Sequence, residues 1–221
     1  MREFEAVVFD MDGVIFDSET ATQECWIELS EKYGIHEMEK TFLACTGTTK
    51  EKTREIMLGT YGEDFPYDKY AKEASVMFHA RYDGGRLPLK PGVEELLGFL
   101  KSNGKKIALA SSTRYQTVTT ELRDAKLLDF FDEVVTGDMV TKSKPDPEIF
   151  LLACEKLGVA PGNAYAIEDS YNGIRSAANG GLRPIMVPDL SRANDEMLEL
   201  SEVVLDDLLC VKDYLQQKSG I

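Results

Sequence analysis

Paired cysteines, histidines and long apolar runs are all scarce in this 221-residue chain. It has two histidines, and its four cysteines lie far apart without a C-x-x-C pair. This spacing argues against a zinc site and against a small disulfide framework. There is no N-x-S/T sequon, the start MREFEAVVFD lacks the apolar stretch of a signal peptide, and no segment approaches the length of a membrane span. We therefore expect a reduced, cytoplasmic protein that does not associate with membranes.

Positive charge is also in short supply. Lysine and arginine number 25 against 39 aspartates and glutamates, which gives a net charge of −14. Such a surface repels nucleic acid and anionic lipid, so we expect neither as a partner. A small anionic substrate is still possible, because a bound cation can reverse the sign of the charge locally.

Two common catalytic motifs are missing as well. The stretch GFLKSNGKK has five residues between Gly98 and Gly104 and no Ser or Thr after the lysine, so it is not a P-loop. No G-x-S-x-G sequence occurs, which removes the serine-hydrolase option.

Short apolar runs of strand length do recur, each followed by polar residues and then by a helical pattern. They cover residues 6–9, 106–110, 133–136, 164–167 and 183–187. Strands that alternate with helices favour right-handed crossovers and a parallel sheet with both faces covered. Nearly continuous apolar strands suit that burial. The pattern predicts a doubly wound, Rossmann-like α/β fold.

One segment breaks the alternation. Between about residues 18 and 86 there is no convincing buried strand, and YDKYAKEASVMFHARY carries an apolar stripe at helical spacing. The segment GGRLPLKPG that follows is rich in Gly and Pro, as a hinge would be. We therefore expect an all-helical insertion at residues 18–87, after the first strand, in a core made of residues 1–17 and 88–221.

Polar groups able to do chemistry follow four of the predicted strands. They are Asp10, Asp12, Ser111, Ser112, Lys144, Glu168 and Asp169. In an open parallel sheet, ligands bind beyond the carboxyl ends of the strands, so these groups should converge. Several carboxylates without a nearby histidine suit a hard cation such as Mg²⁺. A carboxylate can also act as a nucleophile and form an aspartyl-phosphate, while lysine and hydroxyl groups hold phosphoryl oxygens.

Each signal also has a purely structural explanation. A D-x-D-G sequence can be a simple turn. It also resembles the start of an EF-hand loop, but Val14 at the fifth position and the preceding strand do not fit that motif. Ser111 could cap a helix, Lys144 could be a solvated loop lysine, and the Glu168–Asp169 pair could complement a helix N-terminus. The convergence of all four signals at one sheet edge favours a functional site.

Together these motifs resemble the haloacid dehalogenase superfamily. That family has D-x-D-G after its first strand, Ser or Thr after the second, Lys in a later loop and paired acids after the fourth. This chain matches with FDMDGV, ALASS, SKPDP and IEDS, and the resemblance extends from residue 4 to about 188. The sequences of these motifs are most similar to the branch that contains β-phosphoglucomutase and small sugar-phosphate phosphatases.

The resemblance implies roles for the acidic residues. Asp10 would be the nucleophile and a Mg²⁺ ligand. Asp12 would be the general acid and then the general base, and its backbone carbonyl would ligate Mg²⁺. Asp169 would complete the metal site, with Glu168 ligating the ion directly or through water.

It also implies a phosphate site and a mobile cap. Ser111 and Lys144 would bind phosphoryl oxygens. Gly13, Ser112 and Lys50 would contribute to substrate binding. The helical insertion would correspond to the cap that closes over a small phosphorylated metabolite, in a chain that we take to be a monomer.

Three functions compete at this stage. The first is a Mg²⁺-dependent phosphatase of a small phosphate monoester, and the second is a sugar-phosphate mutase. Mutases of this branch carry a cap histidine four residues beyond the hydroxyl residue that matches Ser18, and this chain has Thr22 there. Where they carry an arginine, this chain has Lys50. The third hypothesis is a non-catalytic binding protein on the same fold. A dehalogenase is disfavoured, because dehalogenases of this superfamily lack the second aspartate, which is Asp12 here.

Overall fold

The computed structural model describes residues 4–46 and 50–219 and contains a six-stranded parallel sheet. The strand order is β3-β2-β1-β4-β5-β6. The strands are β1 (Ala6–Phe9), β2 (Lys106–Ser111), β3 (Glu133–Thr136), β4 (Ala164–Glu168), β5 (Arg183–Met186) and β6 (Val203–Val204). The predicted doubly wound α/β fold is confirmed, and the two-residue edge strand β6 is an addition to it.

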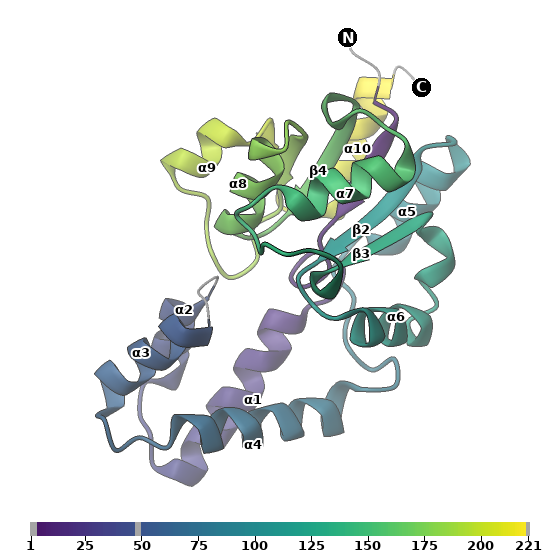
Figure 1. The fold of residues 1–221 in the computed structure, drawn as a ribbon. Helices are drawn as coiled ribbons and strands as arrows, with labels where there is room; N and C mark the ends of the chain where they lie inside the picture. The colour runs from purple at the N-terminus through teal and green to yellow at the C-terminus, as the bar shows by residue number, and fades with distance from the viewer. Residues whose placement is uncertain (1–3, 47–49, 220–221) are drawn as a thin grey trace.

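Helices cover both faces of this sheet (Figure 1). They are α5 (Val93–Ser102), α6 (Tyr115–Asp124), α7 (Glu148–Leu157), α8 (Tyr171–Asn179), α9 (Asp195–Leu200) and α10 (Leu208–Ser219), with short 3₁₀ helices η1 (Leu128–Phe130), η2 (Gly137–Met139) and η3 (Pro161–Asn163). Alternate residues of β1 point to opposite faces. Val7 and Phe9 join the core under α5 and α10, while Ala6 and Val8 join the core under α7.

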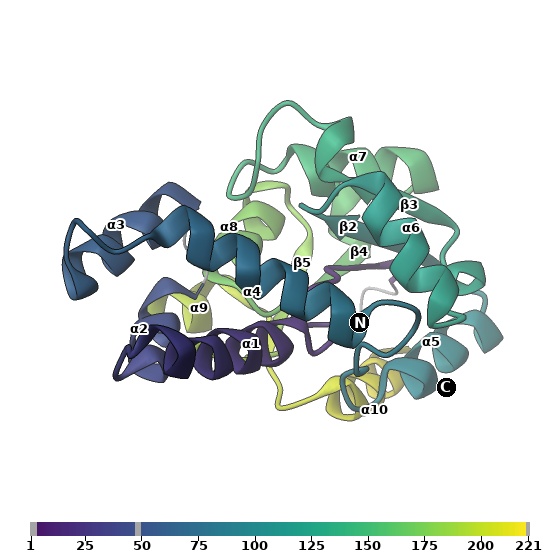
Figure 2. The ribbon, with the colours of Figure 1, turned by 90° about the horizontal axis from the view of Figure 1, so that it is seen from below.

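The helical insertion lies between β1 and β2. It consists of α1 (Ser18–Tyr33), α2 (Met38–Cys45), α3 (Lys50–Tyr61) and α4 (Tyr67–Tyr82). Its own apolar core is centred on Trp26, Met57 and Tyr70. These four helices extend away from the sheet on the side opposite the two chain ends (Figures 1 and 2). This is the all-helical cap that the sequence predicts.

The two linkers between cap and core run side by side. The amide of Asp17 donates to the Pro88 carbonyl at 2.9 Å, and the amide of Lys90 donates to the Ile15 carbonyl at 2.9 Å. The Lys90 ammonium also bridges the carboxylates of Asp17 (3.2 Å) and Asp189 (2.8 Å). The cap is therefore attached through a short two-stranded connection, which a single ammonium ties to the loop after β5.

The strand order reverses at β1, because β2 and β3 lie on one side of it and β4 to β6 on the other. This reversal creates the crevice in which ligands bind in doubly wound sheets. The carboxyl ends of β1, β2 and β4 meet there, at the edge of the sheet that faces the cap. Within the described ranges, no helix combines the length and the apolar character needed to cross a bilayer.

Candidate active site

Asp10 lies at the end of the central strand and holds its carboxylate in the crevice. Its amide donates to the Ile167 carbonyl at 3.0 Å, so the residue continues the ladder between β1 and β4. Asp10 is only 7% exposed. The Lys144 ammonium reaches it from the loop before α7, with 2.6 Å between Nζ and Oδ1. Charge-assisted contacts of this length are strong, and this one fixes one of the two Asp10 oxygens.

Lys144 is held by two more acceptors, so it has little freedom. It donates to the Ala110 carbonyl at 3.1 Å and to Glu168 Oε1 at 2.6 Å. The second Glu168 oxygen accepts from the Ser170 amide (3.1 Å) and hydroxyl (2.9 Å). Protein donors therefore engage both oxygens of the fully buried Glu168 carboxylate.

Gly173 makes room for this carboxylate. A Cβ added at Gly173 would lie 1.8 Å from Glu168 Cδ, a separation that no pair of unbonded carbons can adopt. The same Gly173 amide donates to the Ser170 hydroxyl at 3.0 Å, which caps the start of α8. The Ser170 side chain therefore caps α8 and also helps to position Glu168.

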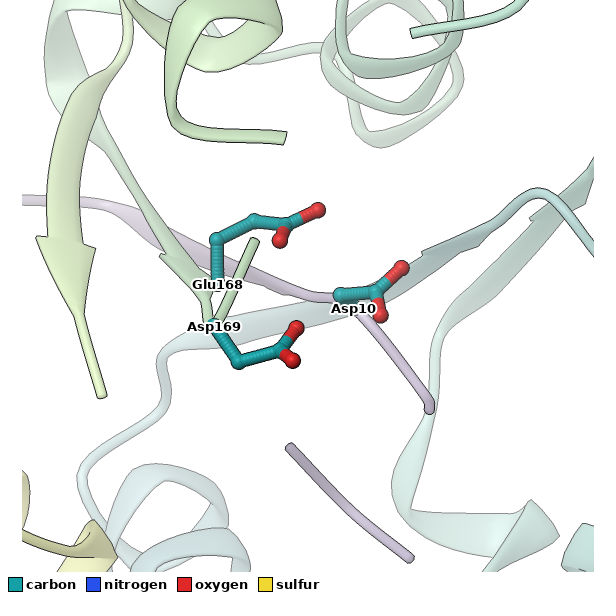
Figure 3. A group of neighbouring side chains, drawn as sticks. All are labelled: Asp10, Glu168 and Asp169. Carbon is teal, nitrogen blue, oxygen red and sulfur yellow. The ribbon is translucent and has the colours of Figure 1, made fainter. Parts of the chain in front are cut away.

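Three carboxylates meet where β1 and β4 end. One oxygen each from Asp10, Glu168 and Asp169 lies within 4.8 Å of the others (Figure 3). Gly13 allows the close approach of Asp169, because its positive φ of 78° suits glycine and an added Cβ would lie 2.4 Å from Asp169 Oδ2. This all-oxygen donor set fits a hard divalent cation such as Mg²⁺.

The charge of the cluster supports the same fit. Three carboxylates face one ammonium, that of Lys144. Burial, together with the charges of Glu168 and Asp12, raises the pKa of Asp10 to about 7 although Lys144 opposes the shift. Burial and the neighbouring Glu168 and Asp10 also raise the pKa of Asp169 well above its usual range. Burial alone would lower the pKa of Lys144, but Asp10 and Glu168 raise it above its usual value. A divalent cation would relieve the repulsion that remains.

Asp12 is in a different environment from the other acids. Its Oδ1 accepts from the Ser18 hydroxyl of the cap at 2.9 Å, and its Oδ2 accepts from the Thr113 hydroxyl of the core at 3.0 Å. Its carboxylate is not part of the three-acid cluster. The expected metal contact through the backbone carbonyl of Asp12 stays a prediction. The two aspartates of the D-x-D-G motif are thus separated. Asp10 belongs to the three-acid cluster, and Asp12 faces the cap.

A pocket of about 400 Å³, which we call the catalytic pocket, opens over these groups. Besides the acids and Lys144, its walls include Ser112, Thr46 of the cap and Tyr171 at the start of α8. Ser111 is fully buried, and its hydroxyl oxygen accepts from the Thr113 amide at 3.1 Å. The structure therefore exposes Ser112 to the pocket and leaves the Ser111 proton free to donate. The phosphate-binding roles assigned to Ser111, Ser112, Gly13 and Lys144 stay predictions.

The cap residues singled out from sequence are less close. Lys50 is the first residue of α3, is exposed and does not line the catalytic pocket. Residues 47–49 of the same TGTTKE motif lie outside the described residues. Thr22, where the related mutases carry histidine, lines a second cavity between the cap and the core.

Two residues of the site received no definite role from the sequence. Thr113 holds Asp12, and no motif predicts it because the two serines before it already match the family pattern. Glu19 lines the catalytic pocket, and burial together with the charges of Asp12 and Asp189 raises its pKa to about 7. The signal for Glu19 was its position one residue after Ser18, at the start of the cap.

Comparison with known sequences decides the family. The profile of haloacid dehalogenase-like hydrolases matches residues 7–187, which include every acid of the site. The chain belongs to the haloacid dehalogenase-like hydrolase family. Membership of this hydrolase family makes the chain an enzyme, which removes the hypothesis of a non-catalytic binding protein.

Relatives with assigned activities include both phosphatases and a mutase. A phosphorylated carbohydrates phosphatase of Thermotoga maritima is 35% identical, over 82% of this chain and 83% of that protein. Hexitol phosphatase B of Escherichia coli is 29% identical, over 97% of this chain and 98% of that protein. The crystal structure of a β-phosphoglucomutase from Clostridium difficile superposes with a TM-score of 0.73 at 28% identity, over 98% of this chain and 97% of that one.

Proposed function

We propose that this haloacid dehalogenase-like hydrolase is a Mg²⁺-dependent phosphatase that cleaves a small sugar-phosphate or polyol-phosphate monoester through an aspartyl-phosphate. The observation that carries the proposal is the separation of Asp10 and Asp12 into two environments. Asp10 belongs to the three-acid cluster with Asp169 and contacts Lys144 at 2.6 Å. Asp12 instead accepts hydrogen bonds from one hydroxyl of the cap and one of the core. A nucleophile and a proton donor need such different surroundings.

In the first step, the free carboxylate oxygen of Asp10 attacks phosphorus, and the bond from phosphorus to the ester oxygen breaks. Lys144 and the Ser111 hydroxyl donate to the phosphoryl oxygens as negative charge develops on them. A protonated Asp12 gives its proton to the departing ester oxygen, so the leaving group departs as an alcohol. Mg²⁺, held by Asp10, Asp169 and the Asp12 carbonyl, would offset the negative charges of the nucleophile and of the phosphoryl group.

In the second step, Asp12 acts as a base. It removes a proton from water while the water oxygen attacks phosphorus and the bond from phosphorus to the Asp10 oxygen breaks, which releases inorganic phosphate, frees the Asp10 carboxylate and leaves Asp12 protonated again. Since both Glu168 oxygens already accept protein donors, we assign Glu168 to positioning Lys144, with any metal contact passing through water. We propose residues 18–87 as the cap domain that closes over these steps, with residues 1–17 and 88–221 as its core. A cytoplasmic location and a monomeric state stay predictions.

Phosphate release across a panel of sugar, polyol and nucleotide phosphates tests the proposal. Turnover should require Mg²⁺, vanish with EDTA and return when Mg²⁺ is added in excess. Asp10→Asn should abolish turnover because a neutral amide is a poor nucleophile. Asp12→Asn should leave a phosphorylated chain detectable by intact-mass measurement, because water then lacks its base. Full activity in EDTA, or an active Asp10→Asn variant, would refute the mechanism.

The mutase alternative is favoured by the structural similarity to a β-phosphoglucomutase. Against it stands Thr22, which lines the cavity between cap and core where the related mutases carry a histidine. The deciding assay supplies β-glucose 1-phosphate with catalytic glucose 1,6-bisphosphate. We expect inorganic phosphate to form faster than glucose 6-phosphate, and the reverse order would establish a mutase.

A further inference from the structure

A second cavity, of about 310 Å³, continues from the catalytic pocket into the space between the cap and the core. We call it the cap–core cavity. Asp12 and Glu19 line both spaces, so the proposed proton donor lies at the boundary between them. A phosphoryl group at Asp10 and Lys144 would therefore direct its ester oxygen past Asp12, and the rest of the substrate would enter the cap–core cavity.

The walls of this cavity combine three kinds of surface. The cap contributes the aromatic rings of Trp26 and Phe78, and both sides contribute hydroxyls, among them Thr22 and Thr117. Its acidic residues are Asp12, Glu19 and Glu121, and the imidazole of His79, from the cap, also lines it. Among the described residues that line the cavity there is no lysine and no arginine. A polyol or sugar suits such walls, since its hydroxyls can donate to carboxylates and its carbon skeleton can lie against aromatic rings.

Glu121 is a carboxylate that the core contributes to the wall of the cap–core cavity. It projects from α6, is partly buried, and also lines a neighbouring cavity of about 230 Å³. His79 lines both cavities, Asp83 lines the neighbouring one, and His79 Nδ1 lies 2.9 Å from Asp83 Oδ1. Burial, with the charges of Asp12 and Asp83 and against that of His79, raises the pKa of Glu121 to about 7. Above that pH, the residue places a negative charge at this wall.

We propose that Glu121 is a specificity-determining residue that admits an uncharged polyhydroxyl leaving group and rejects one that carries a second anionic group. This inference rests on the proposed phosphatase function and names the class of ester that the site selects. Among the described residues that line the cavity, no lysine or arginine is available to pair with a second phosphate or carboxylate, and Glu121 and Glu19 repel such a group. At the effective dielectric of a partly buried site, one like charge about 5 Å away is enough to reduce binding by more than about tenfold.

A matched pair of esters tests the inference directly. Sorbitol 6-phosphate and 6-phosphogluconate have the same six-carbon open chain and differ at the far end, which is a hydroxymethyl group in one and a carboxylate in the other. We expect the wild type to show a kcat/KM at least about tenfold higher for sorbitol 6-phosphate at roughly pH 8.5, where Glu121 is charged. Glu121→Gln keeps the shape and removes the charge, so the preference should shrink at least about fivefold, through faster turnover of 6-phosphogluconate.

Glu155→Gln is the matched control, because it makes the same change in net charge on the exposed side of α7. It should leave the preference unchanged. Equal preference in wild type and Glu121→Gln, or efficient hydrolysis of 6-phosphogluconate by the wild type, overturns the proposal.

A binding measurement separates this inference from the proposed reaction. Calorimetric titration of both esters into Asp10→Asn, with and without Glu121→Gln and in the presence of Mg²⁺, reads selectivity without turnover. Selective binding by Asp10→Asn that Glu121→Gln relaxes, together with no phosphate release by the wild type, would refute the phosphatase and leave the role of Glu121 standing. Phosphate release with equal affinity for the two esters would refute the role of Glu121 alone.

Discussion

Replacing Lys144 with methionine removes one charge from the most buried ionic cluster of the enzyme and keeps most of the side-chain volume. The Lys144 side chain is 8% exposed, and its ammonium contacts Asp10 and Glu168 at 2.6 Å each. In the Lys144→Met variant, the two buried carboxylates of Asp10 and Glu168 lose the cation that pairs with them. Breaking a buried ion pair from one side costs about 3–5 kcal/mol. For a chain of this length, that loss lowers the melting temperature by roughly 10 °C.

The loss should depend on pH with a defined sign. The pKa of Asp10 is raised to about 7 in the folded state, so between its unfolded value and pH 7 the folded protein binds more protons than the unfolded chain. Stability from this group therefore falls as the pH rises through 7. Without Lys144 the pKa of Asp10 rises further, because its main opposing charge is gone. The variant should consequently be more destabilised at pH 8 than at pH 6, by about 1–2 kcal/mol.

Calorimetric melting in EDTA at both pH values measures this effect. Lys142→Met, in the same loop but with its side chain 70% exposed, is the control and should melt within roughly 2 °C of the wild type. Lys144→Met/Glu168→Gln should recover part of the loss, since it removes one of the stranded charges. A Lys144→Met variant that melts like the wild type, or whose loss is the same at pH 6 and pH 8, would refute the reasoning.

Three further outcomes are expected. Gly173→Ala should lose about 1–3 kcal/mol of stability in thermal melts and most of its kcat, because the new Cβ displaces Glu168. Gly98→Ala is the control: a Cβ added there meets no atom within 4 Å, so the variant should be as stable as the wild type or more stable in the same melts. Glu202→Gln should cost roughly 1–2 kcal/mol at pH 7, after allowance for partial exposure. Burial raises the pKa of Glu202, but hydrogen bonds from Arg183, Tyr214 and Tyr165 outweigh it and lower the pKa to about 2. Denaturant titrations should therefore show the cost of Glu202→Gln fade as the pH falls from about 4.5 to about 2. Lys50→Ala should lower kcat/KM for sugar-phosphate esters at an unchanged melting temperature, and unchanged kinetics for every substrate would reject Lys50 as a contact.

The sheet and the convergence of its acids could be predicted from sequence because both depend on short-range patterns. The strand-length apolar runs correspond to β1 to β5 within one residue at each end. Once the strands are parallel, the residues that follow them must lie at one edge, which brings Asp10, Lys144 and Glu168 together. The edge strand β6 was missed because two valines carry no periodicity.

The partners of Asp12 and the position of Glu121 could not be predicted in the same way. Hydrogen bonds from Ser18 and Thr113 depend on side-chain rotamers and on the angle between cap and core, neither of which leaves a pattern in the sequence. Glu121 is one of several polar residues on α6, and only its place on the wall of the cap–core cavity, which α4 also lines, distinguishes it from a solvated glutamate. The cluster around Glu202, with Arg183 at 2.6 Å and Tyr214 at 2.6 Å, likewise forms between distant segments.

The strand order has a consequence for how the enzyme is made. β1 emerges first during synthesis, yet it occupies the centre of the sheet and has no neighbour until β2 follows the whole cap. Asp10 and Lys144 are 134 residues apart, and the second wall of the crevice waits for β4. Contacts that close such long loops form slowly, whereas the local helices of the cap can form early. A growing chain therefore carries a nearly complete cap while Asp10 still faces water, and the cluster of Asp10, Glu168 and Asp169 is complete only once β4 joins the sheet.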